Sequence, residues 1–107
     1  MNLEISILEE ETSSTLVLKG EVDVYTAPKL KDVLLSLAEK QQHKVIIDLS
    51  SVHYMDSTGL GVLIGGLKAS KANNGQLVLK NVTERLDRLF TITGFSQVIE
   101  IKSEEEV

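Results

Sequence analysis

The chain has 107 residues, of which 42% are hydrophobic and 25% are charged, as expected for one soluble globular domain with a single core. Its 16 acidic and 11 basic residues give a formal net charge of −5, and no basic block or aromatic platform offsets that balance, so direct binding to nucleic acid is not expected. The sequence has no cysteine, no apolar run of membrane-spanning length and no signal-peptide pattern, so we expect a cytoplasmic protein without disulfides or membrane association.

Apolar periodicity predicts eight secondary-structure elements in the order β-β-α-β-α-β-α-β. The strands are expected at residues 3–7, 15–19, 45–49, 76–79 and 98–101, and the helices begin near residues 26, 57 and 81. Strands that alternate with helices imply right-handed crossovers, so we expect a single α/β domain over residues 1–107, with packed helices on a mixed, mostly parallel sheet whose first strand is a hairpin edge. Residues 102–107 form an acidic tail that we expect to be disordered.

Local signals mark the ends of the helices. Thr26 is a good N-cap type for the first helix, and the Asn-Asn-Gly run at residues 73–75 is a strong C-terminal signal for the second. Asn81 and Glu84 have capping-box spacing for the third helix, and Gly94 closes it.

The stretch Tyr-Met-Asp-Ser-Thr-Gly-Leu-Gly at residues 54–61 is the loop expected to turn a buried strand into the second helix. Asp56, Ser57 and Thr58 are all suitable N-cap residues, and the sequence leaves open which of them is the cap. In any of these registers at least one hydroxyl lies at the positive end of a helix, and we expect that hydroxyl to be the chemical centre of the protein.

The second helix has an unusual outer face. Its inward stripe follows the spacing i, i+3, i+4, i+7 and consists of Leu60, Leu63, Ile64 and Leu67. Where a solvated helix would carry Lys and Glu, the opposite face has small or apolar residues: Val62, Gly65, Gly66, Ala69 and Ala72. Each interior glycine costs roughly 0.8–1.0 kcal/mol relative to alanine. This face either packs closely inside the domain or docks a protein partner, and we favour docking.

Several catalytic and cofactor motifs fit poorly. The glycines at 59, 61 and 65 are separated from the preceding strand by residues 50–58, so they do not match a dinucleotide-binding fingerprint, and there is no phosphate-binding GxxxxGK[ST] loop. A small hydrolase would use Ser57 with His53, but the nucleophile-elbow motif is absent, and we expect both His43 and His53 at the surface. No metal or cofactor is expected.

Three motifs together resemble the signature of the STAS-domain anti-sigma factor antagonists, most closely the general-stress, sigma-B-type antagonists of Gram-positive bacteria. They are Gly20-Glu21-Val22-Asp23 followed by Ala27-Pro28, then Asp56-Ser57-Thr58-Gly59-Leu60-Gly61, and Arg85-Leu86-x-x-Leu89-Phe90-x-x-x-Gly94. The resemblance covers essentially the whole chain.

The resemblance implies a regulatory binding protein that is not an enzyme. In that family the unphosphorylated antagonist binds a partner that is both anti-sigma factor and serine kinase, and so frees a sigma factor for stress-type transcription. Phosphorylation of the serine at the position of Ser57 abolishes binding, and a serine phosphatase resets the switch. Thr58 is a second candidate acceptor, and Asp23 matches a family acid near the phosphorylation site.

We therefore expect the partner to contact the loops at one end of the sheet and the outer face of the second helix. Because the strands before Asp23 and Ser57 are expected to be parallel, these two residues should lie close together. The expected contact residues are Glu21, Asp23, Tyr25, Asp56, Ser57, Thr58, Gly59, Gly61, Val62, Gly65, Gly66 and Ala69. Two alternatives stay open: a STAS scaffold or ligand-sensing subunit that is never phosphorylated, and the Ser57 hydrolase.

Overall fold

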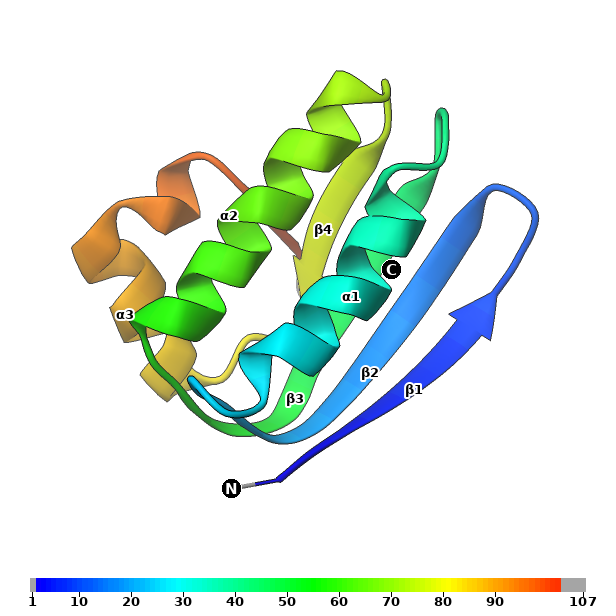
Figure 1. Ribbon diagram of the computed structural model, residues 1–107. Helices are drawn as coiled ribbons and strands as arrows, with labels where there is room; N and C mark the ends of the chain where they lie inside the picture. Colours follow the sequence, from blue (N-terminus) through cyan, green and yellow to red (C-terminus); the bar gives the residue numbers. More distant parts are fainter. Residues whose placement is uncertain (1, 103–107) are drawn as a thin grey trace.

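A five-stranded sheet in the order β1-β2-β3-β4-β5 forms the centre of the fold in the computed structural model, which describes residues 2–102 (Figure 1). The elements in chain order are β1 (Leu3–Glu9), β2 (Ser13–Val22), α1 (Ala27–Ala38), β3 (Lys44–Met55), α2 (Ser57–Ala72), β4 (Gln76–Lys80), α3 (Glu84–Thr93), the 3-10 helix η1 (Phe95–Gln97) and β5 (Glu100–Lys102). Only β1 pairs antiparallel with its neighbour, and β2 to β5 are parallel. The predicted α/β class, element order and hairpin edge are confirmed.

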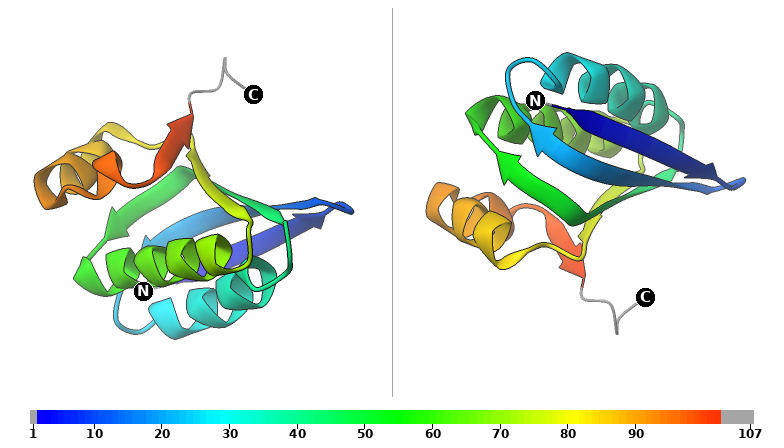
Figure 2. Two further views of the ribbon diagram at one scale, coloured as in Figure 1. Left: turned by 90° about the horizontal axis from the view of Figure 1, so that it is seen from above. Right: turned by 90° about the horizontal axis from the view of Figure 1, so that it is seen from below.

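The helices form two groups around this sheet. Helices α1 and α2 lie side by side on one face, whereas α3 and η1 lie towards the β4–β5 end (Figures 1 and 2). Alternate residues of the central strands, such as Leu16 and Leu18 of β2 and Ile47 of β3, are fully buried in the core. From the helices, Leu34 of α1 and Leu63 of α2 are equally buried. This packing holds α1 and α2 in fixed positions on the sheet.

The largest error in the predicted elements is the end of the third strand, which was expected at residue 49 and followed by a loop that includes residues 54–61. Strand β3 continues to Met55, and only Asp56 separates it from α2. The added part of β3 pairs with the end of β2, which extends to Val22, but the register shifts twice, between Val17 and Lys19 and between Gly20 and Glu21. Such bulges interrupt the two-residue alternation of apolar side chains, so the sequence pattern hid the second half of this strand.

The third helix begins two residues later than a cap at Asn81 would require. Thr83 is the N-cap, and its hydroxyl accepts from the Leu86 backbone N–H at 3.3 Å. Asn81 has a left-handed φ of 57°, and its side-chain amide donates to Asp48 Oδ2 at 3.3 Å. The capping-box prediction is therefore wrong, because Asn81 bridges to β3. Gly94 closes the helix as predicted, with a φ of 80°.

The last strand and the tail also differ from the prediction. Residues 95–97 form η1, so the last strand starts at Glu100 rather than at residue 98, and Lys102 belongs to it. The remaining residues of the expected acidic tail, 103–107, lie outside the described part of the chain. Between residues 2 and 102, none of the helices combines the length and the apolar character needed to cross a membrane.

Candidate functional site

Asp56 is the residue that starts α2. It has extended backbone angles, and its Oδ1 accepts from the backbone N–H of Thr58 at 2.9 Å and of Gly59 at 3.2 Å. This resolves the open choice of N-cap in favour of Asp56. Ser57 is consequently the first helical residue, and both it and Thr58 are exposed. A free hydroxyl therefore lies at the positive end of a 16-residue helix.

The ends of β2 and β3 meet beside this helix start. Val22 pairs with Met55, and the Asp56 N–H donates to the Val22 carbonyl at 3.2 Å. The parallel pairing expected for these strands is confirmed. It places Asp23, which directly follows Val22, at the same end of the sheet as Ser57.

Asp23 organises the turn between β2 and α1. Its side chain is only 4% exposed, and Oδ1 accepts from the backbone N–H groups of Tyr25 at 2.9 Å and Thr26 at 3.0 Å. Thr26 occupies the N-cap position of α1 as predicted, but its hydroxyl makes no capping hydrogen bond. The hydroxyl instead donates to the Glu21 carbonyl and accepts from the Asp23 N–H, so it stabilises the turn. The second carboxylate oxygen, Asp23 Oδ2, is buried without a hydrogen-bond partner within residues 2–102.

The same turn carries an exposed apolar surface. Tyr25 is 82% exposed and Val24 57% exposed. Glu21, at the end of β2, is half-buried, and its Oε1 accepts from the Asn2 N–H at 3.3 Å. The turn therefore offers apolar groups to the solvent while its buried carboxylate points into the loop.

Two of the α2 glycines are packing residues. A Cβ at Gly59 would lie 2.7 Å from Val22 Cγ1, and a Cβ at Gly66 would lie 2.6 Å from Leu34 Cδ2. Both glycines are buried and allow α2 to approach the sheet and α1 closely. The prediction that Gly66 belongs to the outer docking face of the second helix is therefore wrong, and Gly59, expected among the contact residues, has a packing role inside the domain.

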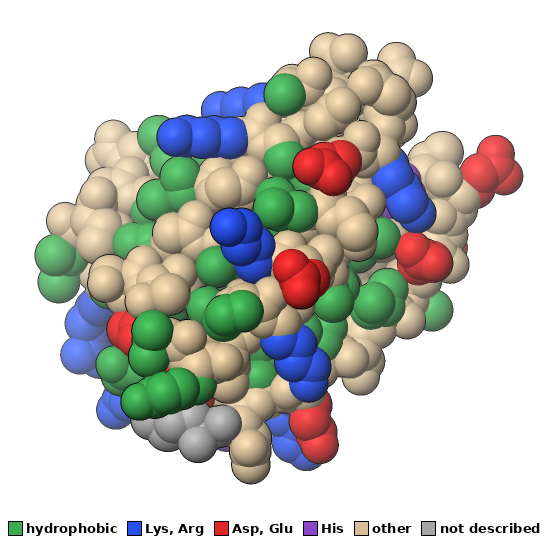
Figure 3. All heavy atoms as spheres, viewed as in Figure 1, with side chains coloured by type: hydrophobic (Ala, Val, Ile, Leu, Met, Phe, Trp, Pro, Cys, Tyr) green, Lys and Arg blue, Asp and Glu red, His purple; other side chains and the backbone are tan. Residues whose placement is uncertain are grey.

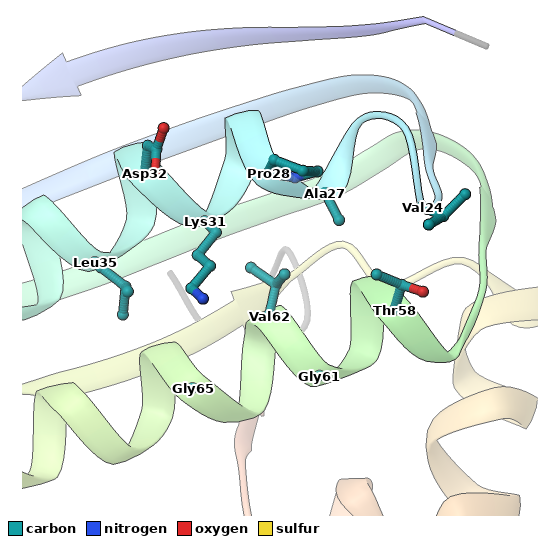
Figure 4. A pocket seen from close by; sticks show the side chains of 10 residues that line it. All are labelled: Val24, Ala27, Pro28, Lys31, Asp32, Leu35, Thr58, Gly61, Val62 and Gly65. Carbon is teal, nitrogen blue, oxygen red and sulfur yellow. The ribbon is translucent and has the colours of Figure 1, made fainter.

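The other two α2 glycines open onto a hollow between α1 and α2. A Cβ at Gly61 or Gly65 would meet no atom within 4 Å. The hollow has a volume of about 690 Å³, and Figure 4 shows Val62 pointing from α2 towards α1 while Lys31 extends from α1 towards α2. Its lining consists of Val24, Ala27, Pro28, Lys31, Asp32, Leu35, Thr58, Gly61, Val62 and Gly65. Ala69, one turn beyond Gly65, is half-buried outside this lining.

Sequence reasoning missed the α1 wall of this hollow. The wall includes Ala27, Lys31 and Leu35, which are spaced four residues apart and so share one face of α1. That spacing was a usable signal. The spacing alone did not indicate a site, because the sequence does not show that α1 lies beside α2.

The two histidines do not form a catalytic pair with Ser57. His53 is exposed on β3, and no hydrogen bond joins it to Ser57 within residues 2–102. His43, expected at the surface, is instead 4% exposed, and its Nε2 lies 2.8 Å from the Ser14 hydroxyl. This buried pair ties the start of β2 to the segment before β3, at the opposite end of the sheet.

The family model for the STAS domain matches residues 4–107. The chain belongs to the STAS domain family. It is 46% identical over 106 residues to the anti-sigma-B factor antagonist of Listeria monocytogenes, covering 98% of this chain and 93% of that protein. It is 44% identical over 106 residues to the anti-sigma-B factor antagonist of Bacillus subtilis, covering 99% of this chain and 96% of that protein.

Solved structures described as anti-sigma factor antagonists have the same fold. An anti-sigma-factor antagonist (STAS) domain protein from Planctomyces limnophilus superposes with a TM-score of 0.83 at 20% identity, covering 95% of this chain and 92% of that one. The anti-sigma factor antagonist SpoIIAA in its unphosphorylated form gives a TM-score of 0.72 at 18% identity, covering 96% and 93%. At these identities the likeness concerns the fold.

Proposed function

We propose that this chain is an anti-sigma factor antagonist that works by partner switching. In its unphosphorylated form it binds an anti-sigma factor that is also a serine kinase and thereby releases a sigma factor for stress-type transcription. Phosphorylation of Ser57 ends the binding, and a serine phosphatase restores it. The identity of 46% and 44% to anti-sigma-B factor antagonists over nearly the full chain supports this proposal.

The observation that carries the proposal is the exposed Ser57 hydroxyl at the first position of α2. The hydroxyl is open to a kinase, and no hydrogen bond within residues 2–102 ties it to the domain. A phosphate there adds about −1.5 to −2 charge and gains roughly 0.3–1 kcal/mol from the helix macrodipole. The folded domain therefore tolerates the modification.

The same phosphate is costly at an interface. A partner that covers Ser57 must desolvate the new charge beside the Asp56 carboxylate, and burying charge without a matching partner costs about 2–5 kcal/mol. A cost of ~2.7 kcal/mol already lowers affinity about a hundredfold. The switch thus acts on the complex, and the fold serves as a rigid support.

The direct test is phosphate transfer by the source organism's anti-sigma factor, purified and supplied with ATP. Intact mass should rise by one phosphate, and peptide mapping should locate it on Ser57. Ser57→Ala should bind the anti-sigma factor constitutively, and Ser57→Asp should bind it weakly. Robust phosphorylation of the Ser57→Ala variant on Thr58 would mean that Thr58, and not Ser57, is the switch residue. If no phosphate is transferred to the parent protein, a STAS scaffold or ligand-sensing subunit would be favoured.

A further inference from the structure

Gly61 and Gly65 have no role inside the domain that accounts for them. Gly59 and Gly66 are required by close contacts with Val22 and Leu34, but the positions of Gly61 and Gly65 have open space where a side chain would begin. Interior glycines weaken a helix, and alanine at either position would meet no atom. No close contact within residues 2–102 therefore requires glycine at these two positions, whereas a partner backbone that approaches α2 closely would.

The hollow that these glycines line has the length and chemistry of a helix-binding groove. It follows α1 from Ala27 to Leu35 and α2 from Thr58 to Gly65, which is about two helical turns, or roughly 10–12 Å at 1.5 Å per residue. Lys31 and Asp32, adjacent in sequence and opposite in charge, are the charged residues of its lining. Figure 3 shows several hydrophobic side chains along the seam between α1 and α2, with basic and acidic side chains among them. Because the lining is mainly apolar and its two charges are opposite, the groove favours an occupant whose contacting surface is mainly apolar.

We infer that an α-helix of the anti-sigma factor lays a ridge of apolar side chains, spaced i, i+3/i+4, i+7, into this groove. This inference rests on the proposed function and names the structural element of the partner that it requires. The bare backbone at Gly61 and Gly65 lets the partner helix approach α2 closely. Exposed Val24, in the turn before α1, extends the apolar surface at the Ser57 end of the groove.

The groove also explains why a phosphate on Ser57 would prevent the partner from binding. Thr58, the next residue, lines the groove, so Ser57 lies beside its mouth. An apolar helix seated there offers no group to solvate or neutralise a phosphate. The modification therefore blocks a site that the rest of the domain keeps fully formed.

The test fills the groove from within. Gly65→Leu places a side chain in the open space, and its affinity for the purified anti-sigma factor, measured by calorimetry on unphosphorylated protein, should fall at least tenfold. Gly61→Ala is the milder variant and should raise the melting temperature while weakening binding less. Ser36→Leu is the matched control, because it adds the same side chain to an exposed position of α1 outside the groove, and its affinity should stay within twofold of the parent.

A second measurement uses the unmodified chain, so it does not depend on any variant folding. In methyl NMR spectra, adding the anti-sigma factor should shift Val24, Leu35 and Val62, and it should leave exposed Ile92 and Val98 unchanged. If the groove methyls do not shift, or if Gly65→Leu binds the anti-sigma factor like the parent, the inference that a partner helix occupies the groove is wrong. A binding defect of Ser57→Asp would still support the proposed function in that case. The inference would also be wrong if light scattering shows a dimer of this chain that Gly65→Leu dissociates, because the groove would then bind a second copy of the chain.

Discussion

Two aspartates hold the surroundings of Ser57 by different means. Asp56 satisfies two of the free N–H groups of the first turn of α2, and Asp23 satisfies two backbone N–H groups of the β2–α1 turn. Asp23 differs in having one buried oxygen, Oδ2, without a hydrogen-bond partner in the described chain. A turn needs only a single acceptor, so a full carboxylate at this buried position is more than the turn requires.

Replacing Asp23 by asparagine separates its two roles. An asparagine oxygen can accept the same two backbone N–H groups, so Asp23→Asn should keep the turn and unfold cooperatively. The charge beside the Ser57 end of the sheet is lost, and we expect slower phosphorylation or weaker binding of the anti-sigma factor. Phosphorylation rate and affinity should be compared with Glu11→Gln, an exposed change in the hairpin at the opposite end of the sheet. Parent-like values for Asp23→Asn in both assays would leave it as a turn residue alone.

The α2 glycines predict opposite effects of the same substitution. Gly66→Ala should destabilise the domain, because the new Cβ would meet the fully buried Leu34 at 2.6 Å and overpacking costs about 1–3 kcal/mol, more than the gain in helix propensity. Gly61→Ala meets no atom and should stabilise it by up to ~1 kcal/mol. Urea denaturation of both variants measures the difference, and an equal sign for the two would contradict the separation of packing glycines from groove glycines.

At the scale of elements, apolar periodicity predicted the five strands and the three α-helices, but it missed η1 and misplaced the ends of β2 and β3 and the starts of α3 and β5. Val45, Ile47 and Leu49 alternate and mark a strand, whereas the next buried residues, Val52 and Met55, break that alternation at the register shifts. A bulge depends on how a neighbouring strand pairs, and this pairing cannot be predicted from the sequence of a single strand. Asn81 misled for a similar reason, since its partner Asp48 is 33 residues away.

The connection between β3 and the segment before α3 predicts a pH dependence of stability. Burial would raise the pKa of Asp48, but hydrogen bonds from the Ser50 backbone and hydroxyl and from the Asn81 amide, together with the nearby Lys80 ammonium, hold the pKa below its ordinary value of 3.8. A lowered folded-state pKa stabilises the fold above the unfolded value, and this contribution is lost as pH falls through the folded value.

Asp48→Asn tests that connection. At pH 7 the variant should have a lower free energy of unfolding than the parent, because the hydrogen bonds to a charged acceptor are lost. Below about pH 4 the parent loses the same contribution, so the difference between the two proteins should shrink. Urea denaturation at pH 7, 5 and 3 measures it. A difference that stays constant over this range would mean that Asp48 acts through packing rather than charge.

At the scale of the whole molecule, the candidate site divides into a part that the sequence could place and a part that it could not. Parallel strands bring the ends of β2 and β3 together, so the closeness of Asp23 to the start of α2 could be predicted. The α1 wall of the groove could not, because it depends on the position of α1 beside α2. The packing of Leu34 on Gly66 helps to set that position, and the sequence presented Gly66 only as one of a row of small residues.

Phosphorylation of Ser57 should leave the architecture of the domain unchanged. Ser57 is exposed and lies where the macrodipole favours negative charge by roughly 0.3–1 kcal/mol, which for a domain of this size raises the melting temperature by a few degrees at most. Calorimetry of the phosphorylated and parent proteins should show this, with Ser57→Ala treated identically as the control. In ¹H–¹⁵N spectra, changes should be confined to the first turn of α2 and the β2–α1 turn, while the fully buried Leu79 of β4 keeps its shift and its slow hydrogen exchange. A lowered melting temperature or loss of exchange protection in β4 would mean that the switch works by unfolding the domain rather than by blocking its surface.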